Sequence, residues 1–395
     1  MVNLKELVSK PISGEWGDEG EGIKVLRTTN FKNNGVINFN NVVTRNVSIN
    51  KIEQKKLIKG DIIIEKSGGS PTQPVGRVVF FDNEGDFICN NFTSILRPKK
   101  DKVIPKYLHY ILFANHKFGI TEMFQNKTTG IINLQLTRYL DKIKVPLPSL
   151  ETQKRIAQIL DDATTLRDRT ELLLKECDAL AQSIFVDMFG DPVRNPKGWD
   201  KERLGNLGVF KNGLNYSKSE NGNKLKVIGI GDFKNLSEIK SFDHISYVEM
   251  NEFPKDNFLL KDEDLLFVRS NGNKELVGRC LMVFVGDKKV SYSGFTIRFR
   301  KNSTSLSNKY LVQLLQRAEF KKYIFKNGRG ANIQNINQEL LNKVEIQLPP
   351  IELQNQFSEK IALIELQKEL AKQELIESQD LFNCLLQKAF KGELV

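Results

Sequence analysis

Two segments of the chain carry apolar residues at alternating spacings of three and four, which is typical of helices that pack along one stripe. The first runs from about Glu151 to Phe189, and its predicted seam is Ile156, Ile159, Ala163, Leu166, Thr170, Leu173, Cys177, Leu180 and Ile184. The second runs from about Glu352 to Phe390, and its predicted seam is Phe357, Ile361, Ile364, Lys368, Ala371, Leu375, Ser378, Phe382 and Leu385. A helix of about 35 residues is about 50 Å long. We expect these two helices to pair with each other; the alternative is that each packs only on its own globular block.

The block ahead of each helix alternates short apolar runs with polar turns. Asp61–Lys66 and Asp264–Arg269 are two such runs, and each is followed by a cluster of Gly, Ser and Asn. This is the pattern of a strand that ends in a tight loop. Shorter helical segments are expected after the strands, and prolines precede each long helix. A mixed α/β or α+β arrangement fits both blocks, and we assign the chain to the α+β class.

The two halves repeat each other with a period near 202 residues. The matching pairs stay in order: Val75–Arg77 with Val277–Arg279, Asn30–Lys32 with Asp232–Lys234, Phe92–Ile95 with Phe295–Ile297, Lys106–Leu108 with Lys309–Leu311, and Leu147–Gln153 with Leu348–Gln354. A period this long indicates two similar domains rather than a solenoid, whose units are far shorter. We therefore predict globular domains at 1–150 and 191–350, followed by long helices at 151–190 and 351–395. One helix leaves each domain, so their pairing is expected to be an antiparallel coiled coil in a pseudo-two-fold tandem repeat.

The net charge of +11 is concentrated in the two globular blocks. Residues 1–150 carry 22 Lys and Arg against 14 Asp and Glu, and residues 191–350 carry 27 against 18. The two helical segments each carry 5 against 8 and are acidic. Basic domains are typical of proteins that bind a polyanion such as nucleic acid, although solvated surface lysines would give the same balance.

Composition and spacing argue against several other classes of protein. There is no run of eighteen apolar residues and no apolar leader after Met1, so we expect neither a membrane span nor a signal peptide. The four cysteines are far apart, which suits a reduced, cytoplasmic protein. The three histidines are also scattered, so we expect no metal site.

The sequence lacks the signatures of the catalytic chemistries considered. It has no GxxxxGK[ST] loop for nucleotide phosphates and no Asn-Pro-Pro-aromatic segment of the kind that holds a flipped base. Gly229-Ile230-Gly231 is more simply a turn. Asp61, Glu65 and Lys66 were considered as a magnesium-nuclease site, but Glu65 and Lys66 are adjacent and would point to opposite faces of a strand. We therefore predict no catalytic residues.

Several segments together resemble one known family, the specificity subunits of type I restriction–modification systems. They are Lys66–Pro71, Gln73–Arg77, Asn90–Ser94, Pro146–Gln153, Asp187–Pro192, Asn195–Trp199 and Gln387–Leu394. The resemblance covers essentially the whole chain. It implies two target-recognition domains that read a bipartite, asymmetric DNA target, and an antiparallel coiled coil that docks two methyltransferase subunits.

The resemblance also implies how the chemistry is divided among subunits. Motor–nuclease subunits join the complex for restriction, so S-adenosylmethionine, ATP and Mg²⁺ are expected in the partner subunits and no cofactor in this chain. The two globular blocks differ strongly between their repeated anchors. That difference is expected if they read different half-sites, so the bases themselves cannot be carried over from the family.

Polar loops after the apolar strands supply the candidate residues for binding double-stranded DNA. In the first block they are Lys66, Ser67, Ser70, Gln73, Asn90, Asn91, Lys127, Thr128, Thr129 and Asn133. In the second they are Arg269, Ser270, Asn271, Asn273, Lys274, Tyr292, Ser293, Arg329, Asn332, Gln334 and Asn335. Asn is suited to bidentate contact with adenine, and Arg with guanine. The alternative for any one of these residues is that it is an ordinary turn residue with no contact to DNA.

Two rival hypotheses remain open at this stage. One is a stand-alone nuclease or fused methyltransferase, which predicts methyl transfer or cleavage by the chain alone. The other is a stand-alone coiled-coil protein whose basic domains bind DNA or acidic proteins. Salt-dependent, sequence-selective retention of duplex DNA would separate DNA binding from protein binding.

Overall fold

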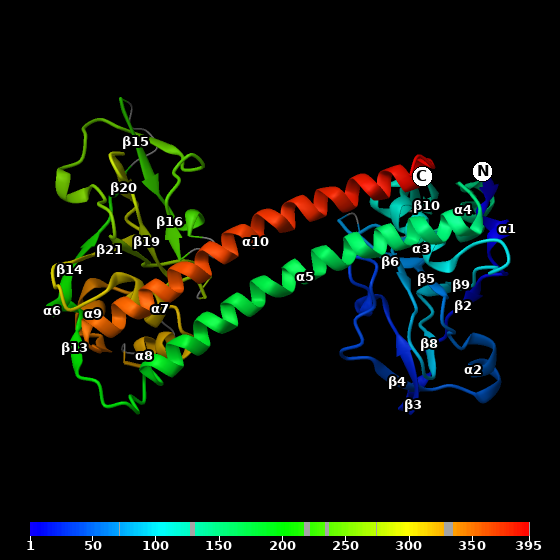
Figure 1. Cartoon of the computed structure of the whole chain (residues 1–395), viewed down its shortest axis with the longest axis horizontal. Coiled ribbons are helices and arrows are strands. Elements are labelled where there is room, and N and C mark those ends of the chain that lie inside the picture. The colour runs from blue at the N-terminus through cyan, green and yellow to red at the C-terminus, as the bar shows by residue number, and fades with distance from the viewer. Residues whose placement is uncertain are drawn as a thin grey trace. The chain divides into compact units, whose positions relative to one another are not determined.

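A computed structural model describes residues 1–70, 72–126, 131–216, 222–233, 237–273, 275–327 and 335–394. The chain forms two compact units, Met1–Leu172 with Ala371–Val395, and Leu173–Leu370. Each unit contains one globular block and a section of both long helices (Figure 1). No helix in the described ranges is both long and apolar enough to cross a bilayer.

The first block contains two main sheets. One has the order β2–β9–β5–β7 and the other the order β4–β3–β8. All their strand pairs are antiparallel except β3 with β8. The strands are β2 (Ile12–Ser13), β3 (Asp18–Leu26), β4 (Val43–Asn46), β5 (Ile62–Glu65), β7 (Val78–Phe80), β8 (Phe87–Cys89) and β9 (Thr93–Leu96). Two smaller sheets join β1 (Val2–Asn3) to β12 (Lys144–Val145), and β10 (Gln125–Asn126) through β11 (Ile132–Leu134) to β6 (Ser67–Gly69).

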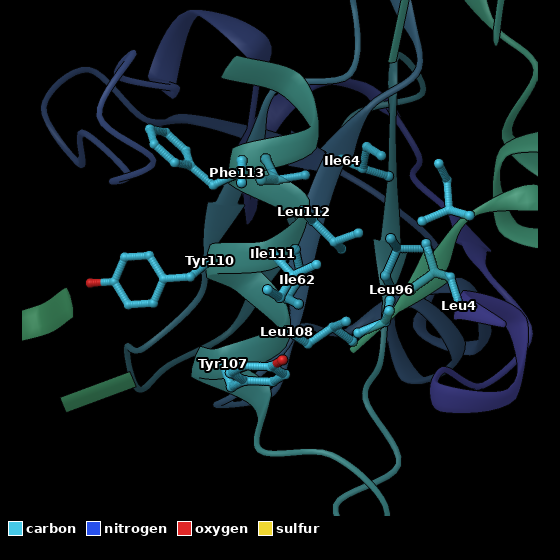
Figure 2. Close-up of a cluster of buried hydrophobic side chains, with 14 of the residues drawn as sticks. Leu4, Ile62, Ile64, Leu96, Tyr107, Leu108, Tyr110, Ile111, Leu112 and Phe113 are labelled. Carbon is cyan, nitrogen blue, oxygen red and sulfur yellow. The ribbon is translucent and has the colours of Figure 1, made fainter. Parts of the chain in front are cut away.

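Strand β5 is buried on both faces, which explains its continuous apolar run. Ile62 and Ile64 face helix α3 (Pro105–Lys117), while Ile63 belongs to the core against the second sheet. Figure 2 shows Leu108, Ile111 and Leu112 of α3 on the side of these strands, whereas Tyr110 points away from them. The other helices of this block are α1 (Leu4–Leu7), α2 (Ile49–Lys55) and α4 (Leu136–Lys142).

The second block repeats this frame, with sheets in the orders β14–β21–β18–β19–β16 and β17–β15–β20. Its strands are β13 (Lys201–Arg203), β14 (Gly208–Asn212), β15 (Asn223–Ile228), β16 (Glu238–Ile239), β17 (Tyr247–Met250), β18 (Leu265–Val268), β19 (Cys280–Val283), β20 (Val290–Tyr292), β21 (Thr296–Lys301) and β22 (Glu345–Gln347). Its helices are α6 (Leu204–Leu207), α7 (Asn308–Leu315), α8 (Ala318–Asn327) and α9 (Gln338–Lys343).

Strand register confirms the tandem repeat residue by residue. Ile63 pairs with Ile95 across β5 and β9, and Leu266 pairs with Arg298 across β18 and β21. The turn that enters each of these strands is also the same. The N–H of Thr93 donates to Asn90 O at 3.0 Å, as the N–H of Thr296 does to Ser293 O at 2.8 Å. Positions that share a pairing or a hydrogen bond of this kind are called equivalent below.

The two long helices, α5 (Leu150–Phe189) and α10 (Ile351–Lys391), pair in antiparallel as predicted. In the first unit Phe382 of α10 packs in one core with Ile156 and Leu160 of α5. In the second unit Phe357 of α10 contacts Phe185 of α5, with ring centroids 5.6 Å apart. The start of one helix therefore lies against the end of the other.

The seam predicted for α10 is confirmed, because all nine of its positions are buried or partly buried. Two of the nine seam positions predicted for α5, Leu166 and Leu180, are wrong by one residue, and the other seven are buried or partly buried. Ile156, Ala163, Thr170 and Cys177 are buried, but Leu166 and Leu180 are 41% and 50% exposed. The buried positions beside them are Arg167 and Ala181. The Arg167 guanidinium lies 5.4 Å from the Phe382 ring centroid, so a cation stacked on an aromatic ring takes the place predicted for leucine.

Candidate nucleic-acid interface

The loops after β5 and β18 are built by the same backbone junction. The N–H of Lys66 donates to Phe92 O at 2.9 Å, and Lys66 O accepts from the N–H of Leu134 at 2.8 Å. In the second block the N–H of Arg269 donates to Phe295 O at 2.8 Å, and Arg269 O accepts from Ile336 at 2.8 Å. Each junction joins three segments that are distant in the sequence. The cationic residue, Lys66 or Arg269, is therefore held beside the phenylalanine that accepts its backbone hydrogen bond.

In the first block several predicted residues gather at this junction. Lys66 Nζ donates to Ser13 Oγ at 2.5 Å, and Ser67 Oγ donates to Asn133 Oδ1 at 2.5 Å. Burial lowers the pKa of Lys66 and the nearby Lys55 charge lowers it further, while Cys89 opposes the shift. Two further members of the predicted set, Ser70 and Gln73, are exposed and hydrogen-bonded to each other, and Asn91 is exposed.

In the second block the predicted residues surround Arg269. Its Nη1 donates to Gly294 O at 3.4 Å, and Ser270 forms a strand-like bridge with Asn335. Asn271 Oδ1 accepts from the N–H of Asn273 at 2.7 Å, which closes an accessible turn. Lys127, Thr128, Thr129, Lys274, Arg329, Asn332 and Gln334 lie outside the described residues.

Three predicted DNA-contact residues have buried side chains. Asn90 is 4% exposed, Tyr292 0% and Ser293 3%. Asn90 and Ser293 form the turn into β9 and β21, where each carbonyl accepts from the N–H and the hydroxyl of the following threonine. Turn-forming residues of this kind are chosen for local hydrogen bonding. We therefore leave these three out of the interface proposed below.

Two exposed aromatic residues were missed as candidates. Phe92 is 43% exposed and Phe295 is 63% exposed, and they occupy equivalent positions beside Lys66 and Arg269. The signal was present in the sequence, since both phenylalanines belong to the repeated segments. Residue chemistry alone did not select them, because phenylalanine is usually buried.

The carboxylates considered for a metal site are held by arginines instead. Glu65 accepts from Arg77 Nε at 2.8 Å and from Nη2 at 3.0 Å. Asp61 accepts from Arg97 Nε at 2.9 Å and Nη2 at 2.8 Å. Bidentate pairs of this kind fix a fold. In the described ranges no three His, Cys, Asp or Glu side chains come together as metal ligands would.

Comparison with known proteins identifies the family. A sequence model of the type I restriction modification DNA specificity domain matches residues 18–175 and again residues 196–377. The chain belongs to the type I restriction–modification specificity subunits. It is 24% identical over 394 residues to the StySPI specificity subunit of Salmonella potsdam, covering 94% of this chain and 82% of the relative. It is 25% identical to the EcoKI specificity subunit of Escherichia coli, covering 87% and 76%.

Solved structures agree with this assignment at the level of the fold. The crystal structure of the type I specificity subunit from M. genitalium aligns over 98% of this chain and 95% of that one, with a TM-score of 0.57 and 14% sequence identity. Each copy of the family domain spans most of one globular block and the first part of the long helix that follows it. The specificity subunit is thus the non-catalytic component that recognises DNA sequence.

Proposed function

We propose that the specificity subunit reads a bipartite, asymmetric DNA target, one half-site with each block. The observation that carries this proposal is the junction built twice on one frame, with Lys66 and Phe92 in the first block and Arg269 and Phe295 in the second. The frame is common to both blocks while the side chains offered at the junction differ. Two junctions with different side chains favour a target whose two half-sites differ in sequence.

The chemistry of each junction suggests how it meets DNA. Arg269 presents a planar donor fork suited to O6 and N7 of guanine, whereas Lys66 is a point charge suited to a phosphate. The exposed rings of Phe92 and Phe295 offer apolar surface for a thymine methyl group or a base face. Ser70, Gln73, Asn91, Asn271 and Asn273 supply polar groups at the rim.

The second part of the proposal concerns partners. Leu363, Leu366 and Leu370 form one stripe of α10 and are 68%, 59% and 60% exposed. Exposed leucines aligned along a helix are typical of a surface covered by another protein. We assign this stripe to docking of a methyltransferase subunit, with two methyltransferase subunits and motor–nuclease subunits in the complete complex. S-adenosylmethionine, ATP and Mg²⁺ would then be bound by these partners, in the cytoplasm.

Methylation by the reconstituted complex tests the DNA proposal. Arg269→Gln is expected to weaken methylation of the cognate site by about tenfold to a hundredfold, because a bidentate base contact contributes about 1–3 kcal/mol of discrimination. Sequencing of methylated sites should show relaxed specificity in one half-site only. Lys66→Gln should instead weaken binding across sequences and reduce the salt dependence, as expected for a phosphate contact.

Lys201→Gln, on the exposed strand β13, is the charge-matched control and should change neither property. Relaxed specificity in both half-sites from Arg269→Gln would contradict the assignment of one half-site to each block. The purified subunit without partners is expected to transfer no methyl group and to cut no DNA. Either activity in a partner-free preparation would refute the division of labour.

A further inference from the structure

The second block carries cations where the first carries hydrophobic side chains. In the first block Ile12 pairs with Ile95 across β2 and β9. The equivalent pair across β14 and β21 is Lys211 with Arg298. Directly opposite residues of an antiparallel pair point to the same face, so the two cations are neighbours. Like charges placed opposite each other destabilise a sheet unless another group compensates them.

The carboxylate that compensates a cation in the first block is missing from the second. Lys55 Nζ lies 2.7 Å from Glu15 Oε2, and the N–H of Glu15 donates to Cys89 O. The equivalent N–H donor in the second block belongs to Leu214, which bonds Tyr292 O. Leu214 therefore occupies the position equivalent to Glu15, and it offers no carboxylate to balance the charges of Lys211 and Arg298.

Burial makes this imbalance costly. Arg298 is 5% exposed, and its buried Nε has no hydrogen-bond partner among the described residues. Its Nη1 donates to Asn257 O at 3.0 Å. Tyr292, which takes the place of Cys89, is fully buried, and its hydroxyl has no hydrogen-bond partner in the part of the chain that the structure describes. Unpaired donors and a charge removed from water are each unfavourable unless a ligand or ordered water satisfies them.

A third cation, Lys255, belongs to the turn that carries Phe258. Lys211 Nζ lies 3.9 Å from the centroid of the Phe258 ring, and the N–H of Phe258 donates to Lys255 O at 2.9 Å. Burial lowers the pKa of Lys211, and the charges of Arg298 and Lys255 lower it further. Mutual repulsion of three cations of this kind is relieved when an anion binds between them.

One carboxylate near Arg298, that of Asp264, is already engaged. Asp264 accepts from Arg300 Nε at 2.7 Å and Nη2 at 2.6 Å, in the pair equivalent to Asp61 with Arg97. In the ranges that the structure describes, no carboxylate oxygen lies within 4.0 Å of a side-chain nitrogen of Lys211, Lys255 or Arg298.

We propose that Lys211, Lys255 and Arg298 form an oxyanion site in the second block that binds a phosphate group. Two ammonium groups and a guanidinium with a free donor match the charge and hydrogen-bonding capacity of phosphate. Strand β14 continues through Gly213 to Leu214, which bridges Ser293 two residues before Phe295. A phosphate of the DNA backbone is therefore one source of the ligand, and free inorganic phosphate is the other.

Titration of the full-length subunit with inorganic phosphate, by calorimetry at constant ionic strength, tests the first source. Lys255→Gln changes an exposed residue, so the variant is expected to fold as the wild type does. It is expected to weaken phosphate binding about tenfold, as one charge-assisted hydrogen bond warrants. Arg298→Ile, which restores the first-block residue, is expected to abolish binding. Lys201→Gln is the control and should bind phosphate as the wild type does.

The assembled complex with duplex DNA tests the second source. If the ligand is a backbone phosphate, Lys255→Gln should reduce the slope of log affinity against log salt by about 0.9, while Lys201→Gln leaves it unchanged. Either phosphate binding sensitive to Lys255 or a reduced salt slope supports the site. The proposal is overturned if the wild type binds no free phosphate and the salt slope is the same in both variants. Equal phosphate binding by the wild type and Lys255→Gln, with an unchanged slope, also overturns it.

Discussion

Each block is joined to its long helix by hydrogen bonds from one buried glutamine, and replacing that glutamine by leucine should strongly destabilise the block. Gln153 is fully buried on α5. Its Oε1 accepts from the N–H of Ile104 at 2.8 Å, and its Nε2 donates to Pro148 O at 2.9 Å. Gln354 on α10 does the same in the second block, accepting from Ser307 at 2.8 Å and donating to Pro349 O at 2.7 Å. These contacts explain why glutamine recurs at the end of the repeated segments Leu147–Gln153 and Leu348–Gln354.

The magnitude follows from the groups left without partners. Leucine has nearly the volume of glutamine, so Gln153→Leu removes hydrogen bonds without opening a cavity. The N–H of Ile104 and the carbonyl of Pro148 then lose their hydrogen-bond partner. Each buried unsatisfied group lowers the free energy of unfolding by about 1–3 kcal/mol. We therefore expect a loss of about 2–5 kcal/mol in the free energy of unfolding, a large part of the stability of an ordinary domain.

Urea unfolding followed by tryptophan fluorescence measures this loss. The chain has two tryptophans, Trp16 in the first unit and Trp199 in the second, so each unit has its own probe. Gln158→Leu, on the exposed side of α5, is the matched control and should change stability by less than about 0.5 kcal/mol. The hydrogen-bond argument fails if Gln153→Leu and the control differ by less than about 1 kcal/mol.

Two further predictions concern a buried histidine and a charge in the helix seam. Burial and the nearby Lys106 lower the pKa of His109 to about 3, so the unfolded chain binds a proton below about pH 6.5 that the folded one does not. Stability should therefore fall as pH drops from about 6.5 toward 3, by up to about 1.4 kcal/mol per unit. His109→Val, which copies the equivalent Val312, should flatten this dependence in unfolding measured at pH 5 and 7; an unchanged slope would refute the assignment. Lys368 lies 2.8 Å from Asp178 across the helices. Lys368→Leu should preserve the melting temperature, because Asp178 remains solvated, whereas Lys368→Glu should lower it; equal losses in both would contradict this.

The helix pairing was predictable because its signal is local and repeated. A heptad pattern needs only the spacing of apolar residues along one segment. Which neighbouring residue lies in the seam depends on the partner helix, so the sequence favoured Leu166 and Leu180 on hydrophobicity alone. Packing instead buried Arg167 under Phe382 and left both leucines half exposed.

The proposed interface was predictable only as far as the loops that contain it. Strand-then-turn patterns located the loops after β5 and β18 correctly. Whether a side chain in such a loop points outward depends on contacts with distant segments, such as that of Lys66 with Leu134. Residue chemistry therefore selected Asn90 and Ser293, which are buried, and passed over Phe92 and Phe295, which are exposed.

Comparison of the two blocks distinguishes residues that recur in both and stabilise the shared fold from residues that differ between them. The Asp61–Arg97 pair recurs as Asp264–Arg300, and in both pairs the same arginine also donates to a backbone carbonyl of the preceding loop. By contrast, the junction residue is Lys66 in the first block and Arg269 in the second. A frame fixed by buried ion pairs and glutamine anchors tolerates a change at the junction because the junction is held by backbone hydrogen bonds, which any side chain permits. If each block reads one half-site, as proposed above, such an arrangement allows the recognised sequence to change without refolding the block.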